Sequence, residues 1–349
     1  MQVKICVLGH FGIGQNLLNG QTVKTKIVTE ELEKQFGSNQ VLKIDTHGGW
    51  KTLLKAPFQV VRALKNSKNI IIFPAHNGLR IYAPLLSFLR PLFKGRRLHY
   101  AVIGGWLPEF LSKRNSLAKS LKRFDGIYVE AATMENALKA QGFENVLIMP
   151  NCKPLTILKE DELTYPEHAP YKLCTFSRVT KEKGIEDAVN AVKEVNKSLE
   201  FQAFSLDIYG QVDQNQNEWF EKLKSNFPDY INYGGLVPFD KSTDILKNYF
   251  ALLFPTYYEG EGFAGTLIDA FSAGLPVIAT DWKYNAEIVG DNVGYIYCTG
   301  KQSELIDILK SVAKDPSMLL KKKKNCLKEA AKYEIQEAVK VLFEQIEGD

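Results

Sequence analysis

The 349-residue sequence lacks the marks of several protein classes. Its five cysteines are odd in number and far apart, with no C-x-x-C pair, so we expect reduced, mostly buried thiols rather than a disulfide framework or a cysteine metal site. No apolar run approaches the roughly 20 residues that a membrane-spanning helix needs. The N-terminus has neither the long apolar core nor the cleavage site of a signal peptide. We therefore expect a cytoplasmic chain without a membrane anchor.

Acidic residues are almost absent between Trp50 and Phe124. That stretch holds 15 lysines and arginines against one acid, Glu109, a net charge of +14, whereas the rest of the chain sums to −10. Segregated charge of this kind is typical of a surface that meets anions, and a solvated basic face is the alternative. Basic and apolar residues alternate there, which favours an anionic membrane surface as partner, with peripheral attachment to the inner face of the cell membrane. No zinc-finger, RRM or basic-zipper pattern supports a nucleic-acid partner.

Short β-branched runs alternate with helical periodicity in two successive blocks. The pattern predicts an α/β protein with two Rossmann-like doubly wound domains, and ligand sites where the carboxyl ends of the strands face a cleft. We expect domains at 1–153 and 171–332, a linker at 154–170, and a C-terminal helix at 333–349 that could pack on either domain. The expected strands are residues 3–8, 41–45, 69–73, 99–103, 126–129 and 145–149, then 172–176, 205–209, 251–254 and 276–279.

A glycine-rich loop follows the first expected strand. Glycines at 9, 12, 14 and 20 would let backbone N–H groups approach a phosphate at the start of a helix. The spacing G-x-x-G-x-G differs from the dinucleotide fingerprint, and the acid that closes the second strand, Asp45, lies far along the chain. A NAD-dependent oxidoreductase is therefore a weak alternative, and a loop that needs glycine only for its turns is another.

Two cations, Arg178 and Lys183, follow the first strand of the second block. A guanidinium and an ammonium beyond a strand's carboxyl end can clamp a diphosphate, although surface loops often carry such residues without a ligand.

The segment from Tyr257 to Trp282 carries the most specific pattern. Glu261 precedes small residues that enter a helix, and Asp269 follows eight positions later in what we expect to be the first turn. Two carboxylates beside a helix N-terminus could accept sugar hydroxyls while the N–H groups bind phosphate, which favours a nucleotide-sugar ligand. The alternative is a capping box between Thr266 and Asp269.

The order of these elements, with AGLPVIATD behind them, resembles the GT-B retaining glycosyltransferases of family 4. The resemblance covers nearly the whole chain and implies a GT-B fold. It places Arg178, Lys183 and Glu261 at the donor diphosphate and the transferred sugar. The donor-binding residues that it implies are Gly20, Val237, Phe263, Ala264, Gly265, Thr266 and Asp269.

Two features depart from the family pattern. Asp269 stands where the family has a second Glu that holds the donor ribose, and Asp is one methylene shorter. The place of a family histidine reads Val-Ile-Gly-Gly-Trp, so no catalytic histidine is carried over. His10 and His76 are possible substitutes near the cleft, or histidines that merely hydrogen-bond a loop.

The resemblance implies transfer of a hexose from a nucleotide diphosphate sugar, which we expect to be UDP-linked, with retention at the anomeric carbon. The expected acceptor is a lipid-linked saccharide in surface polysaccharide or glycoconjugate synthesis. No cofactor is expected, and the absence of an Asp-x-Asp pair predicts metal independence. A non-catalytic GT-B partner subunit of another transferase is the main alternative, and a homo-oligomer or a complex with a partner transferase stays open.

Overall fold

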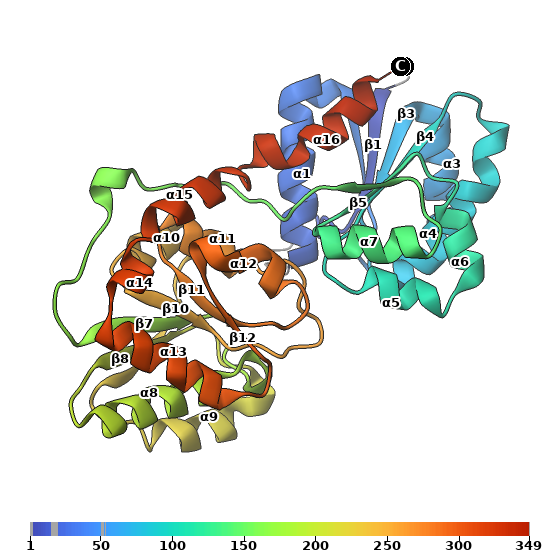
Figure 1. Ribbon diagram of the computed structural model, residues 1–349. Helices are drawn as coiled ribbons and strands as arrows, with labels where there is room; N and C mark the ends of the chain where they lie inside the picture. Colours follow the sequence, from blue (N-terminus) through green and yellow to red (C-terminus); the bar gives the residue numbers. More distant parts are fainter. Residues whose placement is uncertain (1–2, 15–19, 50–51, 53, 349) are drawn as a thin grey trace. The chain divides into compact units, whose positions relative to one another are not determined.

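The computed structural model describes residues 3–14, 20–49, 52 and 54–348 (Figure 1). Contacts divide the chain into two compact units, the first made of Met1–Pro154 with Glu334–Asp349 and the second of Leu155–Tyr333. Each unit is built on one parallel six-stranded sheet. The predicted pair of doubly wound α/β halves is therefore confirmed.

The first sheet has the strand order β2-β1-β3-β4-β5-β6. Inner strands such as those at Ser67–Ile72 and Gly126–Val129 are buried on both faces, which is why apolar runs rather than alternating patterns encode them. The order reverses between β1 and β3, and ligands of open parallel sheets bind at the carboxyl edge beside such a reversal. The strands are β1 Val3–Gly9, β2 Val41–Asp45, β3 Ser67–Ile72, β4 Arg97–Ala101, β5 Gly126–Val129 and β6 Val146–Ile148.

The C-terminal helix α16 (Ile335–Glu347) belongs to this first unit. Its apolar face, with Ala338, Val339 and Leu342, joins a buried cluster that includes Ile5 of β1 and Val28 of the neighbouring helix α1. Each such side chain stabilises the unit by about 1.5–3 kcal/mol. The remaining helices of the unit are α1 Gly20–Phe36, α3 Ala56–Asn66, α4 His76–Leu89, α5 Leu107–Ser112, α6 Asn115–Leu121 and α7 Ala132–Ala140.

The second sheet has the order β12-β11-β10-β7-β8-β9, with the reversal between β10 and β7. The strands are β7 Tyr171–Phe176, β8 Phe204–Tyr209, β9 Ile231–Gly235, β10 Ala251–Phe254, β11 Val277–Thr280 and β12 Gly294–Tyr297. The helices are α8 Ile185–Leu199, α9 Asn217–Lys224, α10 Ser242–Leu246, α11 Gly265–Ser272, α12 Asn285–Val293, α13 Gln302–Lys314, α14 Ser317–Leu320 and α15 Lys323–Ala331.

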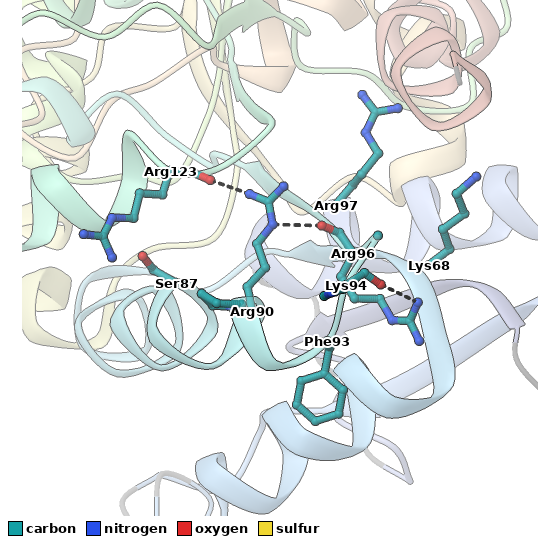
Figure 2. A pocket seen from close by; sticks show the side chains of 10 residues that line it. Lys68, Ser87, Arg90, Phe93, Lys94, Arg96, Arg97 and Arg123 are labelled. Atoms are coloured by element: carbon teal, nitrogen blue, oxygen red, sulfur yellow. Dashed lines mark hydrogen bonds between the residues drawn. The ribbon is translucent and has the colours of Figure 1, made fainter.

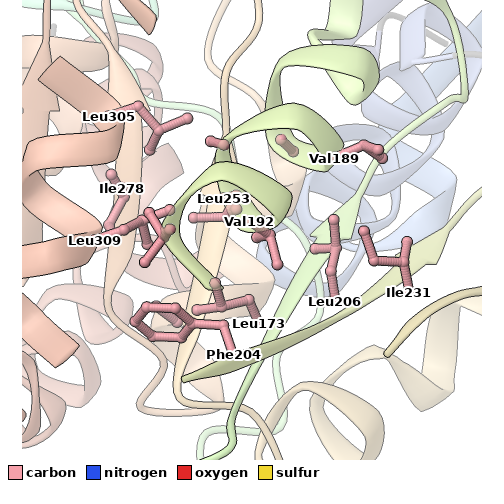
Figure 3. Close-up of a cluster of buried hydrophobic side chains, with 14 of the residues drawn as sticks. Leu173, Val189, Val192, Phe204, Leu206, Ile231, Leu253, Ile278, Leu305 and Leu309 are labelled. Carbon is pink, nitrogen blue, oxygen red and sulfur yellow. The ribbon is translucent and has the colours of Figure 1, made fainter. Parts of the chain in front are cut away.

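Helices α8 and α13 cover one face of this sheet. Val189 and Val192 of α8 and Leu305 and Leu309 of α13 pack over the sheet residue Leu173 in one buried cluster (Figure 3). The spacings of three and four residues put these side chains on one helix face, which anchors the loop before α8 to the sheet.

Two strands and one connection differ from expectation. Strands β9 and β12 escaped the sequence analysis because each is a short edge strand with partly exposed residues and no apolar run. The connection after Pro154 packs on the second unit, where the Leu158 N–H donates to the Ser272 carbonyl at 3.0 Å. Of the five cysteines, only Cys298 is exposed.

None of the helices in the described ranges is both long enough and apolar enough to cross a membrane.

Candidate functional site

A buried ion pair lies at the carboxyl edge of the second sheet, where the strand order reverses. Lys183 comes from the loop after β7, and Glu261 comes from the loop after β10. The Lys183 Nζ donates to Glu261 Oε2 at 2.5 Å, and the side chains are only 9% and 8% exposed. The structure thus brings together two predicted site residues that lie 78 positions apart in the chain.

The backbone around Lys183 explains this placement. Gly184 has a φ of 69°, and a Cβ there would lie 2.1 Å from the Pro255 carbonyl oxygen. Only glycine fits where the loop after β7 passes so close to the loop after β10. The short 3-10 turn Lys181–Lys183 ends at this glycine, and helix α8 starts directly after it.

Glu261 has a second partner that the sequence analysis missed. The Thr256 hydroxyl donates to Glu261 Oε2 at 2.8 Å, and the Thr256 carbonyl accepts a bond from the Thr280 hydroxyl at 2.6 Å. These bonds tie the carboxylate to the ends of β10 and β11. A threonine two residues after an apolar strand is the signal that could have marked it.

Arg178 stands outside the buried pair. Its side chain is 54% exposed, with the guanidinium 5.3 Å from the ring centre of Tyr258 and 4.0 Å from Asp213 Oδ2. Tyr258 also lies 5.2 Å from the Lys183 ammonium, so one aromatic ring faces both cations. A phosphate beside this ring could meet the fork of Arg178 while Lys183 acts from a fixed position.

The start of helix α11 lies beside Glu261. The helix begins at Gly265 with Ala264 as its N-cap, and no side chain caps it. The alternative of a capping box between Thr266 and Asp269 is wrong, because Thr266 lies inside the helix and its hydroxyl donates to the Phe176 carbonyl at the end of β7. Asp269 is the fifth residue of the helix rather than part of its first turn, and it is buried. The uncapped N–H groups of α11 offer partial positive charge next to Glu261.

The remaining predicted donor residues have varied surroundings. The Phe263 ring is buried against Tyr333, with ring centres 4.9 Å apart, so only its backbone could serve a ligand. Val237 is half-buried in the loop after β9. Gly20 lies in the first unit, as the first residue of α1.

His10 belongs to a hydrogen-bonded network at the carboxyl edge of the first sheet. Its Nδ1 lies 2.7 Å from the Thr22 hydroxyl, and its Nε2 lies 2.7 Å from Nδ1 of His47, which the sequence analysis missed. Burial and the neighbouring His47 lower the pKa of His10. Next to it, burial opposes ionisation of Asp45, but N–H groups of Ile13, His47 and Phe11 bond to its carboxylate and lower its pKa overall. Asp45 therefore holds the glycine-rich loop in place through the N–H groups of Phe11 and Ile13.

His76 lies in a separate aromatic group in the same unit. Its ring stacks on Trp106 at 3.9 Å between centres, and Phe110 meets both rings edge-on. The Arg114 guanidinium lies over the Phe110 ring, 3.8 Å from its centre. Burial and the charge of Arg114 lower the pKa of His76. The structure therefore does not bring the two candidate histidines into one cluster.

A second buried ion pair, which the sequence analysis did not predict, lies at the carboxyl edge of the first sheet. Lys24 of α1 donates to Glu130 Oε1 at 2.6 Å, and Glu130 Oε2 accepts the Gly104 N–H at 3.2 Å. A carboxylate directly after a buried strand was the available signal.

Among the residues that the structure describes, no group of three or more His, Cys, Asp and Glu side chains is placed to hold a metal ion.

The second unit resembles known proteins in sequence. Residues 163–334 match the family model of glycosyl transferases group 1. A relative with 34% identity over 134 residues is the UDP-N-acetylglucosamine–peptide N-acetylglucosaminyltransferase GtfA subunit of Streptococcus agalactiae. That match covers 37% of this chain and 25% of the relative, so the chain spans about a quarter of its length.

Solved structures share the fold of this chain beyond the residues that match the family model. HepE of Anabaena in complex with UDP-glucose aligns with a TM-score of 0.72 over 100% of both chains at 16% identity. The lipopolysaccharide outer core galactosyltransferase WaaB aligns with a TM-score of 0.71 over 99% of both chains at 14% identity. The predicted GT-B fold is confirmed.

Proposed function

We propose that the protein is a glycosyltransferase that moves a hexose from a nucleotide diphosphate sugar to a lipid-linked saccharide. The observation that carries this proposal is the buried Lys183–Glu261 pair, set beside the uncapped start of α11 where the strand order of a group 1 glycosyltransferase domain reverses. Cations and helix N–H groups suit a diphosphate, and a buried carboxylate suits sugar hydroxyls.

The chemistry that we propose rests on charge and orientation. Lys183, Arg178 and the α11 N-terminus stabilise the negative charge that develops on the departing diphosphate. Glu261 holds the transferred sugar, while Asp269 faces the donor ribose. The acceptor oxygen bonds to the anomeric carbon on the face from which the diphosphate departs, and the leaving phosphate takes the acceptor proton. Attack on that face retains the configuration without a protein nucleophile. Because the chain's own cations offset the phosphate charge, we expect activity without a divalent metal.

The choice of UDP follows from the similar proteins. HepE was solved with UDP-glucose, and the streptococcal relative is named for UDP-N-acetylglucosamine. We therefore expect this chain to bind UDP in preference to GDP.

The membrane-borne acceptor is supported by the first unit. The net charge of +14 between residues 50 and 124 accompanies exposed apolar side chains on the outer face of α3, where Phe58 is 80% exposed and Val61 41%. Lysine and arginine beside exposed apolar groups favour an anionic lipid surface. We propose peripheral attachment to the inner face of the cell membrane, and synthesis of a surface polysaccharide or glycoconjugate.

A non-catalytic partner subunit is the second candidate. The observation that favours it is the name of the relative, which is one subunit of its enzyme. A non-catalytic subunit would not need the Lys183–Glu261 pair to bind a donor, so the buried pair favours the transferase.

Ligand-induced thermal shift separates these functions. A ligand that binds only the folded state raises the melting temperature as its concentration exceeds its dissociation constant. We expect UDP to raise the melting temperature more than GDP or NAD, and Lys183→Met combined with Glu261→Gln to abolish the shift without leaving a buried charge. Lys181→Met, an exposed lysine of the same loop, is the matched control and should keep the full shift. A shift with NAD alone, or none with any nucleotide, would contradict the proposal.

A further inference from the structure

A second charged site lies in the first unit, at the edge of the sheet where the strands begin. A cavity of about 710 Å³ is lined by six cationic side chains, and none of the described residues that line it is acidic. We call this the basic pocket; its cations are Lys68, Arg90, Lys94, Arg96, Arg97 and Arg123 (Figure 2).

The basic pocket is at the amino ends of the strands. Lys68 and Arg97 are the second residue of β3 and the first of β4, and Arg123 precedes β5. Ligands of open parallel sheets bind at the carboxyl edge, which here carries His10 and His76. The cations of the basic pocket therefore need an explanation other than substrate binding.

Two of the arginines are held rigidly. The Arg90 guanidinium donates to the carbonyls of Arg96 at 2.8 Å and Arg123 at 2.7 Å, and to Asp125 Oδ1 at 3.0 Å, as Figure 2 shows for the two carbonyls. Arg97 bonds to the Gly348 carbonyl and to Gln345 at the end of α16. Among these acceptors only the Asp125 carboxylate carries a charge, so the two bonds of Arg97 leave its positive charge in place.

Two other cations are available to a partner. Lys94 and Arg123 are exposed, and within the described residues their side-chain nitrogens donate no hydrogen bond. They lie in the loop after α4 and in the loop before β5, so they converge on the pocket from different segments.

Two exposed apolar side chains are direct sequence neighbours of residues that line the pocket. Phe88 in the last turn of α4 is 76% exposed, and Leu92, four residues later in the turn Arg90–Leu92, is 75% exposed. Exposing two large apolar groups beside a cation-lined pocket is costly in water, but it suits the boundary between headgroups and acyl chains. A nucleic acid or a free polyphosphate would engage the cations and leave Leu92 in water.

We propose that the basic pocket, with Phe88 and Leu92, docks the protein onto a bilayer that contains anionic phospholipids. The pocket cations bind lipid phosphates, and the two apolar side chains enter the layer between headgroups. This inference rests on the proposed membrane-borne acceptor, and it assigns the membrane contact to residues that the donor site does not use.

Vesicle co-sedimentation of the full chain tests the docking site. The probes are vesicles of phosphatidylcholine alone and of phosphatidylcholine with phosphatidylglycerol. We expect binding only to the anionic vesicles. We expect Lys94→Gln with Arg123→Gln to weaken it about 25-fold, since each cation near an anionic surface contributes about fivefold. Phe88→Ser with Leu92→Ser should weaken the binding that persists at high salt.

The matched control removes two exposed lysines from the second unit, Lys222→Gln with Lys314→Gln, and has the same net charge as the pocket variant. Equal binding by the control and the pocket variant would overturn the proposal. So would full competition by inorganic phosphate or by duplex DNA at an ionic strength where vesicles still bind.

The UDP thermal shift of the pocket variant keeps the two proposals apart. A retained UDP shift with unaltered vesicle binding would overturn the docking site alone. Weakened vesicle binding in a protein that shows no UDP shift even as wild type would overturn the transferase function and support the docking site.

Discussion

The buried pair at the carboxyl edge of the second sheet makes the sharpest prediction about stability. We propose a double-mutant cycle with Lys183→Met, Glu261→Gln and the double variant. Both side chains are more than nine-tenths buried, so removing one partner leaves an uncompensated charge in a poorly solvated place. Breaking a buried pair in this way costs about 3–5 kcal/mol.

The expected loss of unfolding free energy corresponds to a decrease in melting temperature. For a domain of 150–250 residues, 1 kcal/mol lowers the melting temperature by about 2–4 °C, so each single variant should melt roughly 10 °C lower. The double variant removes both charges, and the Gln side chain still accepts the Thr256 hydroxyl bond, so it should be more stable than either single variant. We expect a coupling energy of about 3 kcal/mol.

Scanning calorimetry and urea unfolding of the full chain measure the cycle. Lys181→Met controls for the loss of a lysine from the same loop and should change stability by less than about 0.5 kcal/mol. If the two single effects add to within about 0.5 kcal/mol in the double variant, the pair is not coupled and the reasoning fails.

Two further predictions concern a glycine and a histidine. Gly184→Ala should destabilise the protein by more than about 2 kcal/mol, because Gly184 has a φ of 69° and an added Cβ would clash with the Pro255 carbonyl. Gly300→Ala should cost only about 1 kcal/mol, because Gly300 has a φ of 80° but lies in open space. Urea titration measures both free energies of unfolding, and equal losses would contradict this. Burial lowers the pKa of His99 to about 3, below its ordinary 6.5. The unfolded chain therefore binds the proton at a higher pH than the folded chain does. The free energy of unfolding then falls by about 1.4 kcal/mol per pH unit as the pH drops below about 6. His99→Gln should flatten that slope in denaturant titrations from pH 7 to 4, and an unchanged slope would show that His99 is not responsible.

Strands in the middle of the sheets were predictable from the sequence. Gly126–Val129 and Ala251–Phe254 have the predicted bounds, because an interior strand of a parallel sheet covered on both faces demands continuous β-branched and apolar residues. Edge strands β9 and β12 were not predictable in this way. Each has one neighbouring strand and half-exposed residues, so burial leaves a weaker trace in the sequence.

The site was predictable in its residue types and not in its contacts. Arg178, Lys183 and Glu261 stood out because their positions after strands suit phosphate and sugar chemistry. The local capping pattern of Thr266 with Asp269 was misleading, since the Thr266 hydroxyl finds a nearer acceptor at the end of β7. The only signal for Thr256 is its place two residues after an apolar strand, and His47 has no pattern of its own. Both became partners of site residues through folding.

The sequence by itself determined the α/β class, the two parallel sheets and the concentration of positive charge in the first unit, because periodicity and composition are local properties that burial imposes along the chain. Only the tertiary structure decided that Lys183 meets Glu261, that α16 packs with the first unit, and that scattered arginines and lysines line one pocket at the amino edge of a sheet. These contacts join residues far apart in sequence, and their geometry depends on strand order and packing rather than on any local pattern.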